Sequence, residues 1–473
     1  MNSERRKFHP SVMVVHFIKG IRKWLFFIII VAIDKDNTLV FKLVAISAIL
    51  IIVMITSLVK YFTYSYQLTM QKIIVYKGII KKKETDISYD RIQTIKQRQW
   101  FFFKPFKVVE LLIETASSTP GEAEASLTAV DGSLLEVIEQ LRTTSQSKNK
   151  DSGKVASDPI VSFALSNRQL FIYSLTDVSV FLIIGTLLTF LIEWVPDIFF
   201  TEVELWINQL QWIGTLFILL FSLAAIILLA VIKNVIRFHR FKVTLQEETV
   251  SVDYGLLERK IQKIPLRKIQ AVKVHKQLLR NLIGMSTVEL ILMGGQEKEE
   301  GLASEKILLF PLIRTKTVYK TVAKFLPEMG IIEPDIHLVT TGKLWYFWRW
   351  TLLVGPLLII GGWFLSKWVG LSLLILVLFF LIYQWMKSQK QGYAVQHNQI
   401  LCLQQFNGLS TTQLFVAKRN VQSLTISSSK WLIEKSMSHI QIWLKSGDSP
   451  TYFNVRFIHS EDEQFIYKHF WSS

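Results

Sequence analysis

The chain has 473 residues, of which 50% are hydrophobic and only 19% charged, and its mean hydropathy is +0.33, which is outside the usual range of soluble globular proteins. Its single cysteine, Cys402, excludes an internal disulfide framework and any metal site built from a cysteine cluster. The net charge of +17 has two explanations: an anionic partner, or the Lys and Arg excess that multi-span proteins keep on their cytoplasmic side.

Residues 1–63 predict an N-terminal segment and a first membrane hairpin. The apolar run 24–33 is about 15 Å long as a helix, too short to cross a ~30 Å hydrocarbon layer alone. We therefore expect the helix to begin near Phe17, while residues 39–59 are long enough to span. Whether this hairpin spans or is re-entrant is left open. The basic residues expected to reach the polar surface from it are Lys19, Arg22 and Lys23.

Residues 64–142 predict a first soluble module of several strands and one helix. The runs between residues 64 and 103 are short, β-branched and aromatic, and residues 108–115 and 123–130 are further strand candidates. Apolar residues at helical spacing then follow Asp131, a candidate N-cap. The Ser- and Lys-rich residues 143–160 predict a linker.

The same order of segments follows twice more. Residues 161–236 predict a second membrane hairpin and 237–330 a second module, and residues 331–388 and 389–473 predict the third pair. The connector inside the second hairpin is acidic and has no Lys or Arg, which marks it as an outer loop. In the third module, residues 460–463 have the form of a capping box, so a final helix is expected there.

A repeated signature supports this division. Each module has an extended segment, a glycine, a polar run and then an aliphatic residue followed by glutamine, with glycine-to-glutamine spacings of 15, 15 and 14 residues. The glutamines have two interpretations, a functional one and simple bonding to backbone groups at a strand end. The signature residues are Gly78, Ile92 and Gln93, then Gly255, Ile269 and Gln270, then Gly408, Val421 and Gln422.

Charge in the hairpin turns predicts the orientation. Across the three turns there are two basic residues, Lys35 and Lys367, out of 54 in the chain. The positive-inside rule then places both termini and all three modules in the cytoplasm.

A membrane hairpin followed by strands, this signature and a closing helix resembles the bacterial pleckstrin-homology (PH) membrane proteins of the YdbS/YdbT type, over essentially the whole chain. Arg91 and Lys268 precede the aliphatic-Gln pair in the first two modules, whereas Asn420 takes this place in the third. The resemblance implies an integral membrane α + β protein with three repeats of a transmembrane hairpin and a small PH-like β-barrel with a C-terminal helix. It also implies the bacterial plasma membrane, envelope stress or antimicrobial-peptide tolerance, and a smaller single-module companion protein.

Basic residues on the strands form the first candidate site for lipid or partner binding. Beside a bilayer they would face anionic headgroups, each worth ~1 kcal/mol near the surface; alternatively they are a solvated face that reflects topology alone. In the first module they are Lys81, Lys82, Lys83, Arg91, Lys96 and Arg98, together with the neighbouring Trp100, and in the second Arg259, Lys260, Lys263, Arg267, Lys268 and Lys273.

Aromatic and aliphatic runs are the second candidate. Residues 100–103 in the first module, 278–283 in the second and 431–433 in the third either dip into the membrane interface or pack in a core. Asp177 and Arg349 lie at the edges of predicted spans and are candidates for a polar membrane pathway or for interfacial positions.

We found no phosphate loop, zincin helix, nucleophile elbow or dinucleotide glycine pattern, so we expect no enzyme, no cofactor and no metal site. Nucleic-acid binding is disfavoured because membrane topology explains the positive charge. The sequence therefore predicts a membrane scaffold whose modules contact anionic lipid, each other or a partner, and a homo-oligomer is left open. The alternative is a six-span transporter or channel component.

Overall fold

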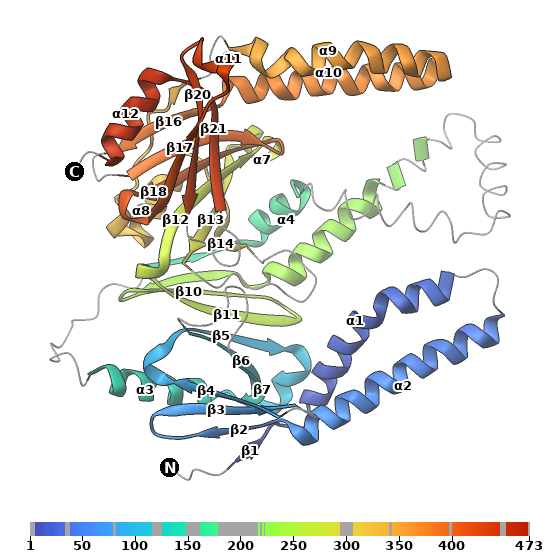
Figure 1. Cartoon of the computed structure of the whole chain (residues 1–473). Coiled ribbons are helices and arrows are strands. Elements are labelled where there is room, and N and C mark those ends of the chain that lie inside the picture. Colours follow the sequence, from blue (N-terminus) through green and yellow to red (C-terminus); the bar gives the residue numbers. More distant parts are fainter. Residues whose placement is uncertain are drawn as a thin grey trace. The chain divides into compact units, whose positions relative to one another are not determined.

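The structure is a computed structural model that describes residues 5–33, 38–78, 82–115, 125–147, 161–177, 216–217, 220–221, 223–293, 306–339, 343–396, 400–444 and 451–471 (Figure 1). The chain divides into two compact units. Unit 1 comprises Met1–Thr119, Ala123–Thr244 and Ser251–Lys263, and unit 2 is mainly Ile264–Ser473. The boundary falls inside the predicted second module, and the division of the sequence into seven segments stays a prediction.

Three described helices are long and apolar enough to cross a membrane: α2 (Leu39–Thr63) in unit 1, and α9 (Leu344–Leu365) and α10 (Lys367–Gln389) in unit 2. Helix α1 (Val12–Ile33) packs along α2 as predicted for a hairpin. Residues 223–238 are helical, but most of the predicted second hairpin lies outside the described residues. The prediction of six spans therefore remains untested.

Hairpin α9–α10 has the features of a bilayer-spanning pair. Ser366 ends α9 and caps α10, where its side chain accepts a hydrogen bond from the Trp368 backbone. Exposed tryptophans lie near both ends, with Trp350 and Trp363 on α9 and Trp368 and Trp385 on α10. Tryptophan prefers the two membrane interfaces, and a helix of 23 residues is about 35 Å long, so these rings fit interfacial belts around a ~30 Å core.

Helix α1 differs from its predicted role. Val12 and Val15 belong to the hydrophobic core beneath the strands, and the Lys19 ammonium bonds a buried carboxylate of the sheet, Glu110, instead of reaching lipid headgroups. The helix therefore begins at Val12, not near Phe17, because its first turns are packed on the soluble module.

Unit 1 contains a four-stranded antiparallel sheet in the order β1-β2-β3-β4. It also contains most of a seven-stranded sheet in the order β7-β6-β5-β11-β10-β9-β8. The first sheet comprises β1 (Arg6–Lys7), β2 (Ser65–Leu68), β3 (Lys72–Lys77) and β4 (Lys83–Ser88). The second comprises β5 (Ile92–Trp100), β6 (Val108–Thr115), β7 (Ala125–Asp131), β8 (Val161–Ala164), β9 (Lys242–Gln246), β10 (Thr249–Tyr254) and β11 (Glu258–Pro265). The short helices are η1 (Tyr89–Arg91), η2 (Phe101–Phe106), α3 (Leu134–Ser147) and α4 (Asn167–Leu175).

Unit 2 holds a seven-stranded sheet in the order β14-β13-β12-β18-β17-β16-β15 and a three-stranded sheet, β19-β20-β21. Its strands are β12 (Ile269–Gln277), β13 (Met285–Leu292), β14 (Ile307–Arg314), β15 (His337–Leu338), β16 (Gly392–Gln396), β17 (Ile400–Asn407), β18 (Ser410–Ala417), β19 (Val421–Ser427), β20 (Met437–Leu444) and β21 (Thr451–His459). Its shorter helices are η3 (Leu266–Lys268), α7 (Leu278–Leu282), α8 (Val318–Phe325), η4 (Pro327–Met329), η5 (Lys418–Asn420), α11 (Lys430–Ile433) and α12 (Ser460–Trp471).

The sheets correct one expectation, since they are not closed barrels. In the PH-like barrel that the resemblance implied, each module would close its strands on itself. Instead, β5 of the first module pairs with β11 of the second, and β12 of the second pairs with β18 of the third. We call these two pairings the junctions. Strands β5 and β12 therefore pair with the next module, and each seven-stranded sheet stays open, with β7 and β8 or β14 and β15 as its edge strands.

Both junctions have the same register. Gln97, the sixth residue of β5, faces Ile261, the fifth residue from the end of β11. Val274 and Gln413 are the residues at the same places in β12 and β18, and they also face each other. Because a slip of one residue would turn every side chain to the other face of the sheet, this agreement indicates one specified mode of pairing.

The signature glycines are explained by their backbone conformation. Gly78 and Gly255 have φ of 115° and Gly408 has φ of 57°, a region that other residues rarely adopt. A Cβ on Gly255 would also lie 2.0 Å from the Glu258 carbonyl oxygen. Each glycine precedes β4, β11 or β18 along the chain, and Lys83 of β4 and Arg259 of β11 belong to the predicted basic residues.

Candidate functional site

Three short helical turns expose large apolar side chains to solvent. They are η2, α7 and α11, which follow strands β5, β12 and β19 respectively along the chain. We call them the apolar turns. Their exposed residues include Phe101 at 55%, Leu282 at 77% and Ile433 at 63%. Isolated exposed apolar residues are common, but the same placement in three corresponding turns calls for an explanation.

Each apolar turn buries one side chain and exposes at least one apolar side chain near it. Phe103 and Leu432 are buried, and at the corresponding place in α7 the buried residue is Arg280, whose guanidinium donates to Thr287 at 2.6 Å. The sequence left open whether these runs were core or interface. The structure assigns one residue of each run to the interior and exposes at least one large apolar residue, while Trp100 and Phe102 are partly buried against the core.

In unit 1, backbone hydrogen bonds connect η2 to the end of the predicted second membrane hairpin. The Phe101 amide donates to the Leu257 carbonyl at 2.6 Å. Leu256, the residue before it, donates to the Ile236 carbonyl at 3.0 Å, in the last turn of helix 223–238. The Lys104 ammonium also donates to the Leu256 carbonyl, at 3.3 Å. The apolar turn η2 therefore lies close to the C-terminal end of helix 223–238, where the chain enters the sheet.

Unit 2 repeats the arrangement beside α9 and α10. The Leu278 amide of α7 donates to the Leu409 carbonyl at 2.9 Å, and nearby Asn407 accepts a hydrogen bond from the Tyr383 hydroxyl of α10 at 3.3 Å. In α11, Trp431 contacts the first turns of α9: its ring centroid lies 5.9 Å from that of Tyr346 and 4.8 Å from the Arg349 guanidinium. All three apolar turns thus lie near the helix ends that connect to the sheets.

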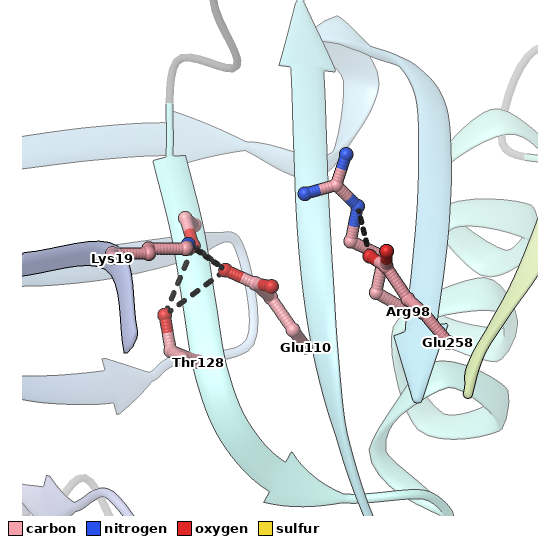
Figure 2. A network of polar contacts seen from close by, with 6 residues as sticks. Lys19, Arg98, Glu110, Thr128 and Glu258 are labelled. Atoms are coloured by element: carbon pink, nitrogen blue, oxygen red, sulfur yellow. Dashed lines mark hydrogen bonds and ion pairs between the residues drawn. The ribbon is translucent and has the colours of Figure 1, made fainter. Parts of the chain in front are cut away.

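A buried ionic cluster joins α1 to the sheet of unit 1 (Figure 2). The Glu110 carboxylate on β6 is fully buried; it accepts from Lys19 Nζ at 3.0 Å, from Ser126 Oγ at 3.2 Å and from Thr128 Oγ1 at 3.4 Å. On the adjacent strand β5, Arg98 forms an ion pair of 3.1 Å with Glu258 of β11, across the first junction. Sequence patterns missed the Lys19–Glu110 pair, because the two residues are 91 positions apart.

The charges around Glu110 decide its ionisation. Burial by itself raises the pKa of this carboxyl, but the positive charges of Lys19 and Arg98 and the hydrogen bonds from Lys19 and Ser126 outweigh burial, so the pKa lies below its ordinary value. Glu289 on β13 has a related setting: His275 Nε2 lies 2.8 Å from its carboxylate, and the pKa is again lowered despite burial. Both carboxylates thus have a lowered pKa although they lie inside sheets.

The predicted basic residues do not form one face. Lys82, Lys83 and Arg259 are exposed and follow the signature glycines, whereas Arg91 and Arg267 are exposed at the opposite ends of β4 and β11. Lys96 and Arg98 are buried at the first junction, and Trp100, Lys260, Lys263, Lys268 and Lys273 are half-buried. Arg259 forms a bidentate pair with Asp253. Lys81 and the Gln93 side chain lie outside the described residues.

The two ionisable residues at predicted span edges have partners. Asp177 follows α4 and lies 3.5 Å from Lys233 and 3.2 Å from the Asn234 amide nitrogen. Arg349 stacks on Trp431. Both positions are typical of a membrane interface, where an ionisable side chain pairs with an opposite charge or with an aromatic ring.

Within the described residues, no group of three His, Cys, Asp or Glu side chains has metal-binding geometry. Unit 2 has a cavity of about 250 Å³ lined mainly by η5, the segment Leu326–Met329 and neighbouring strand ends. Its charged lining residues include Glu328 and Arg419, which face each other at 3.9 Å.

Comparisons with known proteins give one family and one relative that matches over nearly the whole chain. Residues 24–146 and 178–324 match the sequence model of a family described as bacterial PH domain. The UPF0699 transmembrane protein YdbT of Bacillus subtilis (strain 168) is 26% identical to this chain over 505 residues, which cover 99% of this chain and 98% of the relative. No solved structure matches the chain.

Proposed function

This chain belongs to the bacterial PH domain family, and from that premise we propose that it is a non-enzymatic membrane scaffold whose modules lie against the bilayer and hold one another through shared sheets. The observation that carries the proposal is the position of the apolar turns. They expose Phe101, Leu282 and Ile433 beside the soluble ends of hairpin helices, where a bilayer surface begins.

The energetics favour insertion of these turns into the membrane interface. Removing a Leu, Ile or Phe side chain from water stabilises by about 1.5–3 kcal/mol when burial is complete. Aromatic rings and long aliphatic side chains are accepted at the headgroup level. Exposed lysines flank the turns, with Lys104 and Lys107 around Phe106 and Lys430 beside Trp431. Such lysines attract anionic lipid at ~1 kcal/mol each near the surface.

Lipid headgroups are the proposed partners of the basic residues that follow the signature glycines. Lys82 and Lys83 lie at the end of β4 that adjoins the hairpin, whereas Arg91 and Arg267 lie a strand length further away. A strand rises about 3.3 Å per residue, so residues at the far ends are beyond a Debye length of about 8 Å from the headgroups. We assign lipid contact to the first group alone.

The proposal places the modules and both termini in the cytoplasm of a bacterium, with the hairpins in the plasma membrane. Few basic residues lie in the hairpin turns, which supports this orientation. A role in tolerance of envelope stress or antimicrobial peptides rests on the resemblance alone. The rival transporter function needs ionisable groups available to a pathway, and Asp177 and Arg349 are instead engaged by Lys233 and Trp431.

Spin labels on single-cysteine variants of the full chain test the proposal. In a Cys402→Ala background, labels at Phe101→Cys, Leu282→Cys and Ile433→Cys are compared in anionic proteoliposomes. The matched control is Asp90→Cys, an exposed residue of η1. We expect the three turn labels to be more accessible to oxygen, which partitions into lipid, than to a water-soluble nickel complex, and the control label to show the reverse.

Equal accessibility of turn and control labels to the nickel complex would show that the turns face water and would remove lipid contact from the proposal. The Asp90→Cys variant also reports orientation. A membrane-impermeant maleimide should label it in inverted vesicles and leave it unlabelled on intact cells, and labelling on intact cells would contradict the cytoplasmic location.

A further inference from the structure

The two junctions leave one complementary edge at each end of the module series. In the first junction the edge of β5 binds the edge of β11, and in the second the edge of β12 binds that of β18. Strand β19 occupies the place of β5 and β12, and β4 occupies the place of β11 and β18, each beside the corresponding 3-10 helix. Yet β19 and β4 are edge strands, with no further strand beside them among the described residues.

The exposure of these edges differs from that of their counterparts. In β18 nearly every residue is buried, whereas Lys83, Glu84 and Asp86 of β4 are exposed. In β19, Gln422, Ser423, Thr425, Ile426 and Ser427 are exposed, whereas most of β12 is buried. The same kind of strand is therefore covered inside the chain and uncovered at its ends.

The sequence of β19 lacks the usual protection of an edge. Free edges are commonly blocked by charged residues, proline or a bulge, because an open row of backbone groups can bind another strand. Residues 421–427 contain neither a charged residue nor a proline. The strand does have a register shift between Val421 and Ser423, but β5 and β12 have the same shift and still pair at this edge. Strand β4 does carry charges, but β11 carries Arg259 and Lys260 and still pairs with β5. Charge on this type of strand is thus compatible with pairing.

We propose that β19 of one copy of this chain binds β4 of a second copy, in the register of the two internal junctions. A second copy is the fitting occupant because one chain carries both halves of a contact that it already makes twice internally. The contact is heterologous, so repeated use gives a ring if the rotation closes and a filament if it does not. Confinement of both copies to one membrane raises their effective concentration. The inference builds on the proposed scaffold function.

The internal junctions fix the expected register. The sixth residue of β5 or β12 faces the fifth residue from the end of β11 or β18. Applied to the two free edges, this rule places Ile426 opposite Glu84 and therefore Thr425 opposite Thr85. Two residues further along, Ser427 is placed opposite Lys83. These residues lie on exposed or half-exposed edge positions, so single cysteine substitutions are compatible with folding.

Disulfide cross-linking between differently tagged full-length chains tests the proposal. The two chains, both Cys402→Ala, are co-expressed and mild oxidation is applied in native membranes. We expect a mixed-tag dimer when Thr425→Cys meets Thr85→Cys, and when Ser427→Cys meets Lys83→Cys. Opposed residues on antiparallel strands are about 4.5–5.5 Å apart, within disulfide range.

The crossed combinations are the matched controls. Thr425→Cys with Lys83→Cys, and Ser427→Cys with Thr85→Cys, are out of register by two residues, about 7–8 Å apart on the diagonal, and we expect at least about fivefold less dimer. All variants should react with a small maleimide, which confirms that the thiols are available.

Three results would overturn the proposal: no mixed dimer above the crossed controls, equal dimer in all four combinations, or a disulfide formed only within one chain that carries both cysteines. The last result would mean that β19 and β4 of the same chain pair with each other. None of these outcomes alters the spin-label result at the apolar turns, so failure of self-assembly and failure of membrane contact are distinguishable.

Discussion

At the scale of single residues, the Lys19–Glu110 pair ties a hairpin helix to a sheet. Glu110 is fully buried and bonded to Lys19, Ser126 and Thr128. Removing one member of a buried ion pair leaves the other charge without compensation in a medium where desolvation is expensive. Lys19 is about half exposed, so part of its effect is screened by water.

We expect Lys19→Met to lower the free energy of unfolding by about 1–3 kcal/mol, because Glu110 then keeps a buried carboxylate with fewer donors. Thermal unfolding of the solubilised full chain measures the change. Lys23→Met is the matched control: Lys23 lies on the same helix and is exposed. Equal losses for the two variants would mean that the pair contributes nothing specific.

The lowered pKa of Glu110 determines the direction in which pH changes the stability of the fold. Its folded pKa is below the ordinary value of 4.5, so the ionised form stabilises the fold fully above that pH, and this contribution is lost as pH falls through the folded pKa. Glu110→Gln should therefore show a smaller fall in unfolding temperature than the wild type as pH drops below about 4.5. A steeper fall for the variant would contradict the assignment.

At the scale of elements, glycines determine how closely the hairpin helices pack. A Cβ at Gly370 of α10 would lie 2.7 Å from Trp363 Cε3 and 3.1 Å from its Cα. A Cβ at Gly361 of α9 would meet nothing within 4 Å. The two positions lie on the two helices of one hairpin and differ in whether the partner helix occupies the space.

We expect Gly370→Ala to destabilise the hairpin by about 1–3 kcal/mol through overpacking. Gly361→Ala should be neutral or stabilising, because alanine has the higher helix propensity. Unfolding of the full chain in detergent, followed by circular dichroism, compares the two. If both alanines have the same effect, the close approach of α9 and α10 does not limit stability.

Many elements were predictable because their signals are local. Strand β6 matches the predicted residues 108–115 in full, and α9 and α10 begin and end within a few residues of the predicted spans. Alternation of β-branched residues and runs of apolar residues depend only on neighbours along the chain. The signature glycines were found the same way, and their positive φ gives the physical reason.

The sheet sharing was not predictable from the same signals. Strand β11, with the sequence ERKIQKIP, has an alternating pattern that fits a partner in its own module as well as it fits β5. Which edge it meets depends on chain geometry over more than 150 residues. Likewise, the basic residues were grouped by composition, whereas the structure divides them between exposed turns, strand ends and the buried first junction.

At the scale of the whole molecule, the first junction joins segments on either side of the predicted linker at residues 143–160. Strand β5 precedes the linker and β11 follows it. The two strands pair with each other, with Gln97 opposite Ile261. The Arg98–Glu258 ion pair adds a side-chain contact across this junction. Covalent continuity of the linker is therefore not what holds the two segments together.

We expect the chain to stay assembled when the linker is cut at a protease site inserted between residues 148 and 160. The N-terminal fragment, isolated through its tag in mild detergent, should retain the C-terminal fragment. Ile261→Pro should release it, because proline cannot donate a backbone hydrogen bond and disrupts a central strand. Ile261→Val, which preserves pairing, is the control, and separation of its fragments would contradict the prediction.

The seating of α1 has a mechanical consequence. Val12 and Val15 are fixed in the core, a Cβ on Gly20 would lie only 2.5 Å from Val53 of α2, and Lys19 is bonded to β6. These contacts connect α1 to both α2 and the first module. We therefore expect a change in the tilt of this helix pair to be transmitted to the attached strands.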